Sequence, residues 1–151
     1  MKKRILITGA GGYIGCILTE VLLKSGYQIR ALDRFFFGSD LLQSSPDLEL
    51  VKNDTRLFDD SVFEDVHAVI DLAAISNDPS GELFQESTWD INHKARASMA
   101  SRAKNNGVER YILPSSCSVY GFLEEGVIAD ENSKTNPLTT YAKANLKAEE
   151  D

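Results

Sequence analysis

Cysteine, histidine and tryptophan are scarce in this sequence of 151 residues, which contains two, two and one of them respectively. Cys16 and Cys117 are too few for a disulfide framework, and neither lies in the spacing of metal ligands. We therefore expect a reduced compartment and no bound metal.

Long hydrophobic runs are also absent. The first residues, MKKRILITGAGGYIG, are basic, but their apolar run ILI ends at Thr8, whereas a secretion signal needs about seven apolar residues or more. No stretch approaches the roughly 20 apolar residues of a membrane-spanning helix. These absences predict a cytoplasmic protein without a membrane partner.

Negative charge outweighs positive charge, since 16 lysines and arginines face 23 aspartates and glutamates, giving a net charge of −7. An acidic chain of this kind is a poor partner for nucleic acid or for an anionic membrane. A phosphorylated small molecule is still compatible with the composition, because backbone amides bind phosphate locally without any net positive charge.

Short apolar runs alternate with helical patterns along the chain, which is typical of a parallel sheet with crossover helices. The predicted strands are 4–8, 27–33, 48–54, 67–74 and 109–116. Helices are predicted over 14–24, near 59–64, over 82–106 and over 141–151, with a loop and a partial helix at 34–46. The predicted fold class is therefore α/β, a doubly wound parallel sheet forming one domain over residues 1–151.

A glycine-rich turn, TGAGGYIG, joins the first predicted strand to its helix. Gly9, Gly12 and Gly15 allow the backbone to turn sharply and to approach a pyrophosphate, while the helix N-terminus offers free N–H groups. The alternative interpretation is a tight strand–helix connection with no ligand. The position of the turn, directly after the first strand, favours a dinucleotide.

Asp33 ends the second predicted strand, eighteen residues beyond Gly15. This is close to the spacing of about 20 for the carboxylate that holds the adenosine ribose. A carboxylate there accepts hydrogen bonds from both ribose hydroxyls and repels a 2′-phosphate, which favours NAD over NADP. Arg34 keeps NADP open as the alternative, because a neighbouring arginine can hold that phosphate.

Six motifs, TGAGGYIG, NDTR, DLAA, IN, SSCSVYG and PLTTY, follow one another along the chain. In this order they resemble the motifs of the extended short-chain dehydrogenase/reductase family, which comprises NAD-dependent epimerases, dehydratases and related enzymes that act mostly on nucleotide sugars. The resemblance implies a Rossmann sheet of strand order 3-2-1-4-5. It also implies a C-terminal part that builds the sugar-nucleotide pocket and is absent here, as we expect from the final helix, which has no stop signal.

The resemblance assigns cofactor-binding roles to residues at the ends of all five strands and on the long helix. They are Gly9, Gly12, Tyr13, Ile14 and Gly15 at the pyrophosphate turn, Asp33 and Arg34 at the ribose, Asp54 and Thr55 at the adenine, Leu72, Ala73 and Ala74 along the cofactor channel, Asn92 behind the nicotinamide half, and Ser115 at the start of the catalytic loop.

The resemblance further makes Tyr141 the catalytic acid/base and Ser116 the hydroxyl that orients the substrate. Cys117 and Ser118 stand where dehydratase members carry an acid pair, so dehydration of a sugar is not expected. The implied reaction is transient hydride transfer between a sugar carbon and NAD, as in an epimerase. A simple reductase acting on a small carbonyl is the alternative within the enzyme class.

Asn145 departs from the family pattern Y-x-x-x-K, because it stands where the lysine four residues after the tyrosine is expected. The pKa of a free tyrosine is about 10, so proton transfer near pH 7 requires a shift of roughly 3 units, or about 4 kcal/mol. The family's lysine supplies a cation near the phenol and hydrogen-bond donors to the nicotinamide ribose. Lys143 and Lys147 cannot replace it, because offsets of two and six point elsewhere around a helix.

Two hypotheses of different classes follow. The first is the NAD-binding portion of a nucleotide-sugar epimerase, with Ser116, Tyr141 and Asn145 in the catalytic position. The second is a dinucleotide-binding sensor or scaffold without turnover, which Asn145 favours. The resemblance also implies a homodimer whose interface is formed by the helices at 82–106 and 137–151.

Overall fold

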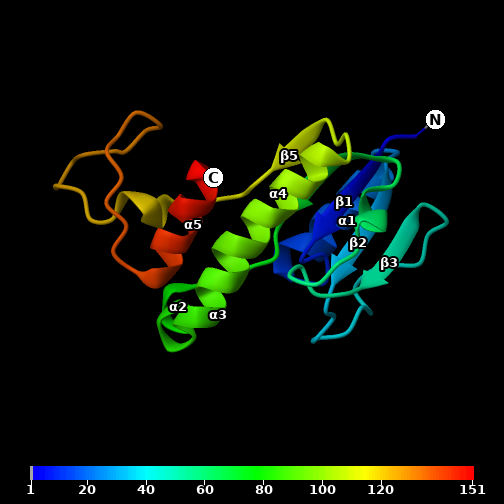
Figure 1. Cartoon of the computed structure of the whole chain (residues 1–151), viewed down its shortest axis with the longest axis horizontal. Helices are drawn as coiled ribbons and strands as arrows, with labels where there is room; N and C mark the ends of the chain where they lie inside the picture. The colour runs from blue at the N-terminus through cyan, green and yellow to red at the C-terminus, as the bar shows by residue number, and fades with distance from the viewer. Residues whose placement is uncertain (1) are drawn as a thin grey trace.

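The computed structural model of the chain describes residues 2–151 and contains one sheet of five parallel strands. Their order is β3-β2-β1-β4-β5 (Figure 1), which confirms the predicted Rossmann-type fold and strand order. The strands are β1 (Arg4–Thr8), β2 (Gln28–Asp33), β3 (Leu48–Lys52), β4 (Val66–Asp71) and β5 (Arg110–Ile112).

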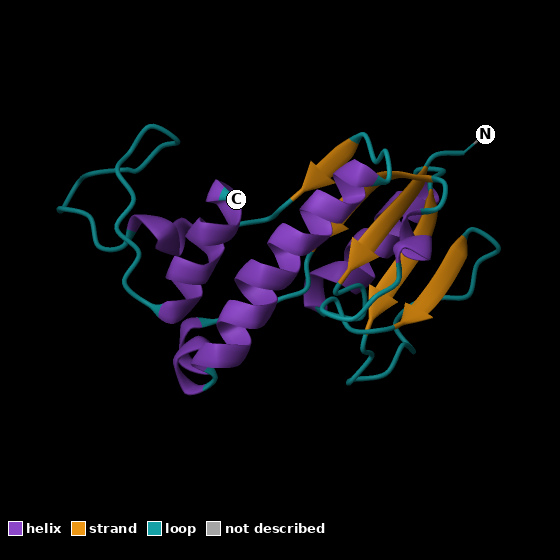
Figure 2. Cartoon of the chain, in the orientation of Figure 1, coloured by secondary structure: helices purple, strands orange, loops and turns teal. Residues whose placement is uncertain are grey.

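Helical segments connect the consecutive strands except β2 and β3, which are joined by irregular backbone, and they cover both faces of the sheet (Figure 2). The α-helices are α1 (Tyr13–Lys24), α2 (Asp78–Leu83), α3 (Gln85–Trp89), α4 (Arg96–Asn105) and α5 (Thr140–Glu150). A π-helical segment, η2 (Asp90–Ala95), joins α3 to α4, and two short 3-10 helices lie at η1 (Asp60–Phe63) and η3 (Cys117–Tyr120).

The core has two halves because successive side chains of a strand point to opposite faces of the sheet. Ile5 and Ile7 of β1 lie in the cluster that faces α1, whereas Leu6 lies in the other cluster, together with Met99 of α4. Each half buries a continuous apolar layer. The sheet is therefore the middle layer of three, which is the arrangement that keeps an all-parallel sheet out of water.

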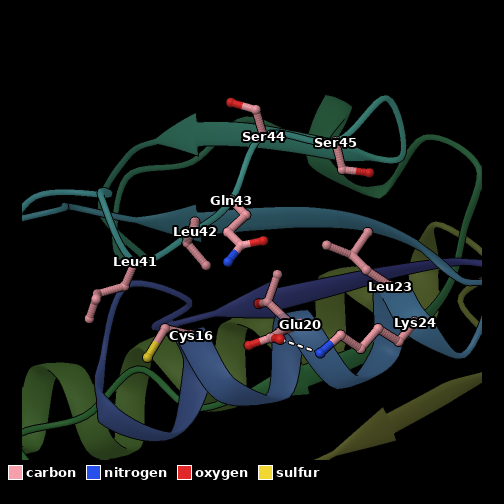
Figure 3. Close-up of a pocket in the computed structure, with 10 residues that line it drawn as sticks. Cys16, Glu20, Leu23, Lys24, Leu41, Leu42, Gln43, Ser44 and Ser45 are labelled. Atoms are coloured by element: carbon pink, nitrogen blue, oxygen red, sulfur yellow. Dashed lines mark hydrogen bonds and ion pairs between the residues drawn. The ribbon is translucent and has the colours of Figure 1, made fainter.

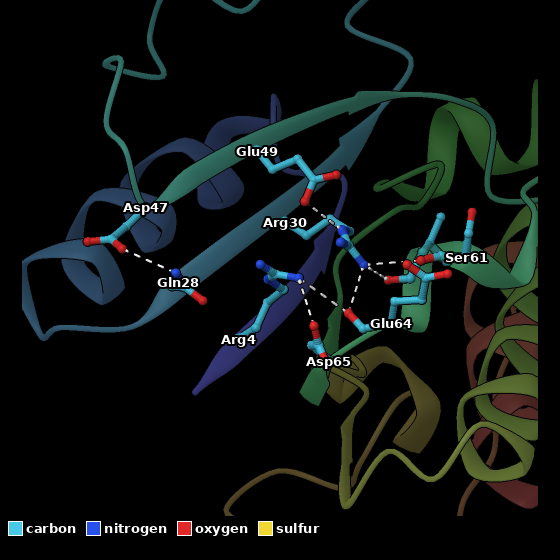
Figure 4. Close-up of polar contacts among 9 residues, drawn as sticks. Arg4, Gln28, Arg30, Asp47, Glu49, Ser61, Glu64 and Asp65 are labelled. Atoms are coloured by element: carbon cyan, nitrogen blue, oxygen red, sulfur yellow. Dashed lines mark hydrogen bonds and ion pairs between the residues drawn. The ribbon is translucent and has the colours of Figure 1, made fainter. Parts of the chain in front are cut away.

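Arg30 is the charged residue that ties β2 to its neighbours on one face of the sheet (Figure 4). Its Nε donates to Glu49 Oε2 of β3 at 2.9 Å, and its Nη1 donates to the carbonyls of Ser61, Val62 and Glu64 at 2.8–3.2 Å. A buried guanidinium is tolerated when its N–H groups find acceptors in this way. The contacts fix η1 against the middle of the sheet.

The prediction of one uninterrupted helix over 82–106 is wrong. Phe84 has a non-helical backbone (φ −122°, ψ 54°) that separates α2 from α3, and its side chain is exposed instead of facing the core. The π-helical segment then inserts one additional residue per turn between Asp90 and Ala95. Thr88, Met99 and Ala103 do lie buried on the predicted face.

The partial helix predicted within 34–46 is also wrong, since this stretch contains only turns and irregular backbone. Three predicted strands are shorter than expected: 48–54 ends at Lys52, 67–74 ends at Asp71, and 109–116 covers only Arg110–Ile112. In each case the chain leaves the sheet at the edge where the predicted functional residues begin.

Candidate functional site

The stretches predicted to carry function all follow the carboxyl ends of the parallel strands, so the sheet brings them to one edge. The glycine turn follows β1, Asp33 ends β2, Asp54 follows β3, Leu72–Ala74 follow β4, and the serine segment at 115–118 follows β5. Helix α5 adds Tyr141, and η3 of the serine segment packs against that helix.

The glycine turn is closely packed, which explains its residue types. Gly9 has φ +65°, and a Cβ there would lie 2.8 Å from the Ala73 nitrogen at the end of β4. A Cβ on Gly15 would lie 2.3 Å from the Gly9 carbonyl oxygen. Side chains at these two positions would force β1, α1 and β4 apart, so glycine keeps the turn tight.

The N-terminus of α1 points its free N–H groups out of this turn. Gly12 is the N-cap and provides no capping side chain, and the first turn contains no acidic residue. The first amides of α1 therefore keep the capacity to bind an anion such as a pyrophosphate. Tyr13 and Ile14, predicted at this position, are both exposed at the start of the helix.

Asp33 lies across the turn, with its carboxylate bound to two backbone amides. Oδ2 accepts from the Gly11 nitrogen at 3.1 Å and Oδ1 accepts from the Phe35 nitrogen at 2.6 Å. Each carboxylate oxygen can accept a further hydrogen bond. The carboxylate is thus fixed in orientation while it retains acceptor capacity for two ribose hydroxyls.

Asp54 follows β3, and its carboxylate contacts two arginines. Arg56 binds its carboxylate through Nε and Nη2 at 2.9 and 2.7 Å, and Arg34 lies 3.4 Å away. The hydrogen bond from Arg56 is the main cause that lowers the pKa of Asp54 to about 2. Arg34 therefore forms an ion pair with Asp54. The guanidinium carbon of Arg34 also lies 4.1 Å from the centre of the Phe36 ring.

Replacing Asp54 by asparagine is expected to destabilise the fold at neutral pH by up to about 2 kcal/mol, because a lowered carboxylate pKa is a stabilising term. The term is complete above the unfolded pKa of about 3.9 and is lost as the pH falls toward 2. Unfolding by denaturant at pH 7 and pH 2.5 measures this stabilisation. The difference in free energy of unfolding between wild type and Asp54→Asn should be smaller at pH 2.5. Asp65→Asn is the control, since that side chain is 90% exposed. A difference in free energy of unfolding that stays constant with pH would contradict the stabilising role of the Asp54 carboxylate.

Asn92 holds the loop that follows β4 through two side-chain hydrogen bonds. The side chain is fully buried in the π-helical segment, where Oδ1 accepts from the Ile75 nitrogen at 2.8 Å and Nδ2 donates to the Ile75 carbonyl at 2.9 Å. Both ends of its amide are thus used by one backbone unit. Asn92 fixes the path of the residues after Leu72–Ala74 along the predicted cofactor channel.

Tyr141 lies in the first turn of α5, whose N-terminus is held by α2. Thr139 caps the helix by accepting from the Ala142 nitrogen at 3.1 Å, and Glu82 accepts from the Thr140 nitrogen at 2.5 Å. A Cβ on Gly81 would lie 3.0 Å from the Tyr141 Cβ. Gly81 and Glu82, which no sequence motif identifies, therefore position the tyrosine.

The two predicted serines make different contacts. Ser116 is the N-cap of η3, and its Oγ accepts from the Ser118 nitrogen at 3.2 Å and lies 2.8 Å from Ser118 Oγ. Ser115 is exposed, and its hydroxyl donates to Glu149 on α5. Both serines thus lie on the segment that packs against the tyrosine helix.

Asn145 is buried on the α5 face that bears Tyr141, with only 2% of its surface exposed. Its Nδ2 donates to the Tyr141 carbonyl at 2.9 Å, and its Oδ1 accepts from Arg96 Nη1 at 2.6 Å. Lys143 is exposed, and Lys147 forms ion pairs with Glu150 and Asp151. The cation beside Asn145 is therefore Arg96, which comes from α4.

One cavity lies along α1, and a second lies beside the residues that follow β3. The first, of about 250 Å³, lies between α1 and residues 41–45, and none of the predicted cofactor residues lines it (Figure 3). The second, of about 300 Å³, is lined by Thr55 and Arg56 on one side and by residues of η2 and α4 on the other. The second cavity thus brings the predicted adenine-binding Thr55 next to the helix that carries Asn92.

The parallel sheet, the glycine turn at the start of α1 and the fixed carboxylate of Asp33 define a dinucleotide-binding protein of Rossmann type. Residues 5–151 match the NAD dependent epimerase/dehydratase family, and the chain belongs to that family.

Three similar proteins illustrate the family relationship. UDP-glucuronic acid decarboxylase 1 of Danio rerio is 29% identical over 80% of this chain and 29% of its own length. The solved structure of MoeE5 in complex with UDP-glucuronic acid and NAD superimposes with a TM-score of 0.87 and 28% identity, covering 97% of this chain and 47% of that one. The solved structure of the UDP-N-acetylglucosamine 4-epimerase of Methanobrevibacter ruminantium superimposes with a TM-score of 0.90 and 25% identity. The match covers 99% of this chain and 49% of that one.

This chain therefore spans about half of the solved chains and less than a third of the decarboxylase. Within residues 2–151, no helix is long and apolar enough to cross a membrane. The same residues contain no group of three or more histidine, cysteine or acidic side chains arranged to hold a metal ion.

Proposed function

We propose that this chain is the cofactor-binding portion of an NAD-dependent nucleotide-sugar epimerase or a closely related oxidoreductase. The observation that carries the proposal is that the glycine turn and the Asp33 carboxylate lie at one edge of the sheet, and that Arg96 links the tyrosine helix to the end of β4 at the same edge. Family membership supports it, and so does the similar MoeE5 structure, which is a complex with UDP-glucuronic acid and NAD.

NAD is the proposed cofactor in preference to NADP. Asp33 would hold the adenosine ribose, and its carboxylate would repel a 2′-phosphate in the same place. Arg34, the residue that could offset this repulsion, pairs with Asp54 instead. The amides at the start of α1 would bind the pyrophosphate, with Gly9, Gly12 and Gly15 allowing its close approach.

When bound, NAD supplies the hydride acceptor and donor. Tyr141 takes the proton of a sugar hydroxyl as the hydride leaves the same carbon, so that C–OH becomes C=O. Ser116 holds the oxygen of that group by a hydrogen bond. Tyr141 returns the proton when the hydride returns, to the opposite face of the carbon in an epimerase.

A panel of UDP- and dTDP-sugars tests the proposal with the natural full-length protein. We expect conversion of one sugar to its epimer with catalytic NAD, with transient absorbance of reduced nicotinamide at 340 nm. A simple reductase would instead consume reduced cofactor stoichiometrically. An absence of NAD binding by calorimetry would overturn the proposal altogether.

The second candidate function is a dinucleotide-binding sensor or scaffold without turnover. The observation in its favour is Asn145, which brings no charge to the position of the family's lysine. NAD binding without conversion of any sugar in the panel would establish this candidate.

We also propose that residues 1–151 form one domain of a longer cytoplasmic protein. An intact mass near twice 16.7 kDa is expected for the natural polypeptide, because the chain spans about half of its solved neighbours.

A homodimer is expected through residues 82–106 and 137–151. Light scattering on that polypeptide measures its oligomeric state, and a monomer would contradict the dimer.

A further inference from the structure

We propose that Arg96 supplies, from α4, the cation and the hydrogen-bond donors that the family's lysine supplies from the tyrosine helix. The inference deepens the proposed function and rests on it. In this chain the positive charge beside the catalytic tyrosine would have moved from the tyrosine helix to the first residue of α4, directly after the segment η2 that packs against α5.

The guanidinium of Arg96 lies between the end of β4 and α5. Its Nη1 donates to Asn145 Oδ1 at 2.6 Å, and its Nε donates to the Ala73 carbonyl at 3.3 Å. Ala73 belongs to the predicted cofactor channel, and Asn145 lies one helical turn after Tyr141. Arg96 therefore links the two structural elements between which the nicotinamide half would bind.

The charge of Arg96 is not neutralised by a carboxylate. The side chain is 5% exposed, yet none of the ion pairs among residues 2–151 includes it. The buried carboxylate nearby is Asp71, which instead accepts from the hydroxyls of Thr8 and Tyr111. Burial, with the neighbouring Asp71 charge, raises the pKa of Tyr111 well above its usual range, so that Tyr111 remains a neutral donor to Asp71.

A buried guanidinium without a carboxylate partner is unfavourable unless its N–H groups find other acceptors. Nη2 of Arg96 makes no hydrogen bond within residues 2–151. Among the side-chain nitrogen and oxygen atoms of these residues, the only one that is both fully buried and without a partner is Thr19 Oγ1, so Nη2 is not fully buried. Its two N–H groups remain available to a ligand such as the hydroxyls of a ribose.

This geometry predicts opposite effects for the same substitution in two backgrounds. Asn145→Lys alone restores the family's residue but places an ammonium against the Arg96 guanidinium, so two cations would share one buried position. Arg96→Met alone removes both the cation and its donors. The double variant Arg96→Met/Asn145→Lys has one cation again, placed on α5.

The test is a set of NAD titrations by calorimetry on the natural full-length protein, with melting temperatures recorded without cofactor. Arg96→Met should weaken NAD binding roughly 10- to 100-fold, as expected for lost hydrogen bonds from a charged group. Arg96→Lys keeps the cation but loses the fork that reaches Ala73 and Asn145 together, so it should bind NAD more weakly than wild type and more tightly than Arg96→Met. Asn145→Lys should lower both the melting temperature and the affinity, and the double variant should recover both.

Arg110→Met is the matched control, because Arg110 is exposed on β5 and makes no side-chain hydrogen bond or ion pair within residues 2–151. If Arg96 only tied α4 to α5, a lysine introduced at Asn145 could not restore NAD binding to Arg96→Met. That outcome, or unchanged affinity in Arg96→Met, would overturn this inference alone. Wild-type protein that binds no NAD would overturn the proposed function as well.

Discussion

Replacing Tyr141 by phenylalanine is expected to lower the turnover of the nucleotide sugar by about 10²- to 10⁴-fold, which is the usual contribution of a general acid/base. The phenol oxygen makes no hydrogen bond within residues 2–151, so it is free to take a proton from a ligand. The Tyr141 backbone and Cβ, which contact Asn145 and Gly81, are unchanged by the substitution. The fold and the affinity for NAD should therefore be retained.

Steady-state kinetics with the active sugar measures this loss, and NAD calorimetry shows whether the cofactor site is intact. Tyr27→Phe is the control, because Tyr27 follows α1 and packs with the core cluster on that face of the sheet. Activity that survives Tyr141→Phe would remove Tyr141 from the mechanism. Loss of NAD binding together with activity would instead show that the phenol helps to build the site.

The sequence predicted the fold well because its two periodicities are strong and repeat. The strand at 4–8 is a short apolar run that ends at a glycine turn, whereas the strand predicted at 27–33 alternates apolar and polar residues. Their carboxyl ends therefore located the edge of the sheet where the candidate site lies. The order of the strands is not encoded in such local patterns, and it came from the family resemblance.

The interruption of the long helix could not be predicted from residue types. A π-helical segment inserts one residue without requiring glycine or proline, and Asp90–Ala95 contains neither. Its cause is tertiary, since Asn92 is held by both the N–H and the carbonyl of Ile75. The family resemblance singles out position 92 as a residue near the nicotinamide half, and that role stays a prediction, whereas the contacts of Asn92 with Ile75 come from the structure.

Arg96 was missed for a related reason. An arginine in a helical pattern indicates a solvated face when only the sequence is considered, since arginine is rarely buried. Its partner Asn145 is 49 residues away in the sequence, and only the packing of α5 against η2, the segment directly before Arg96, brings them to 2.6 Å. A departure from a family motif was visible in the sequence, but the residue facing it was not.

Replacing Gly15 by alanine is expected to weaken NAD binding at least roughly 100-fold, the equivalent of about 3 kcal/mol. The added Cβ would lie 2.3 Å from the Gly9 carbonyl oxygen and 2.7 Å from the Ala10 Cα. Both obstacles are backbone, so no side-chain rotation can relieve the contact. The start of α1 has to move away from β1, and the amides that would bind the pyrophosphate move with it.

Gly107→Ala separates this effect from the general consequence of adding a methyl group to a glycine. Gly107 has φ +78°, and a Cβ there would meet no atom within 4 Å, so the substitution costs only about 1–2 kcal/mol of backbone strain. Gly107→Ala should lower the melting temperature and leave NAD affinity unchanged, whereas Gly15→Ala should lose affinity beyond any change in melting temperature. If Gly15→Ala bound NAD normally, the amides of α1 would not be the pyrophosphate site, and the turn would be only a tight connection between β1 and its helix.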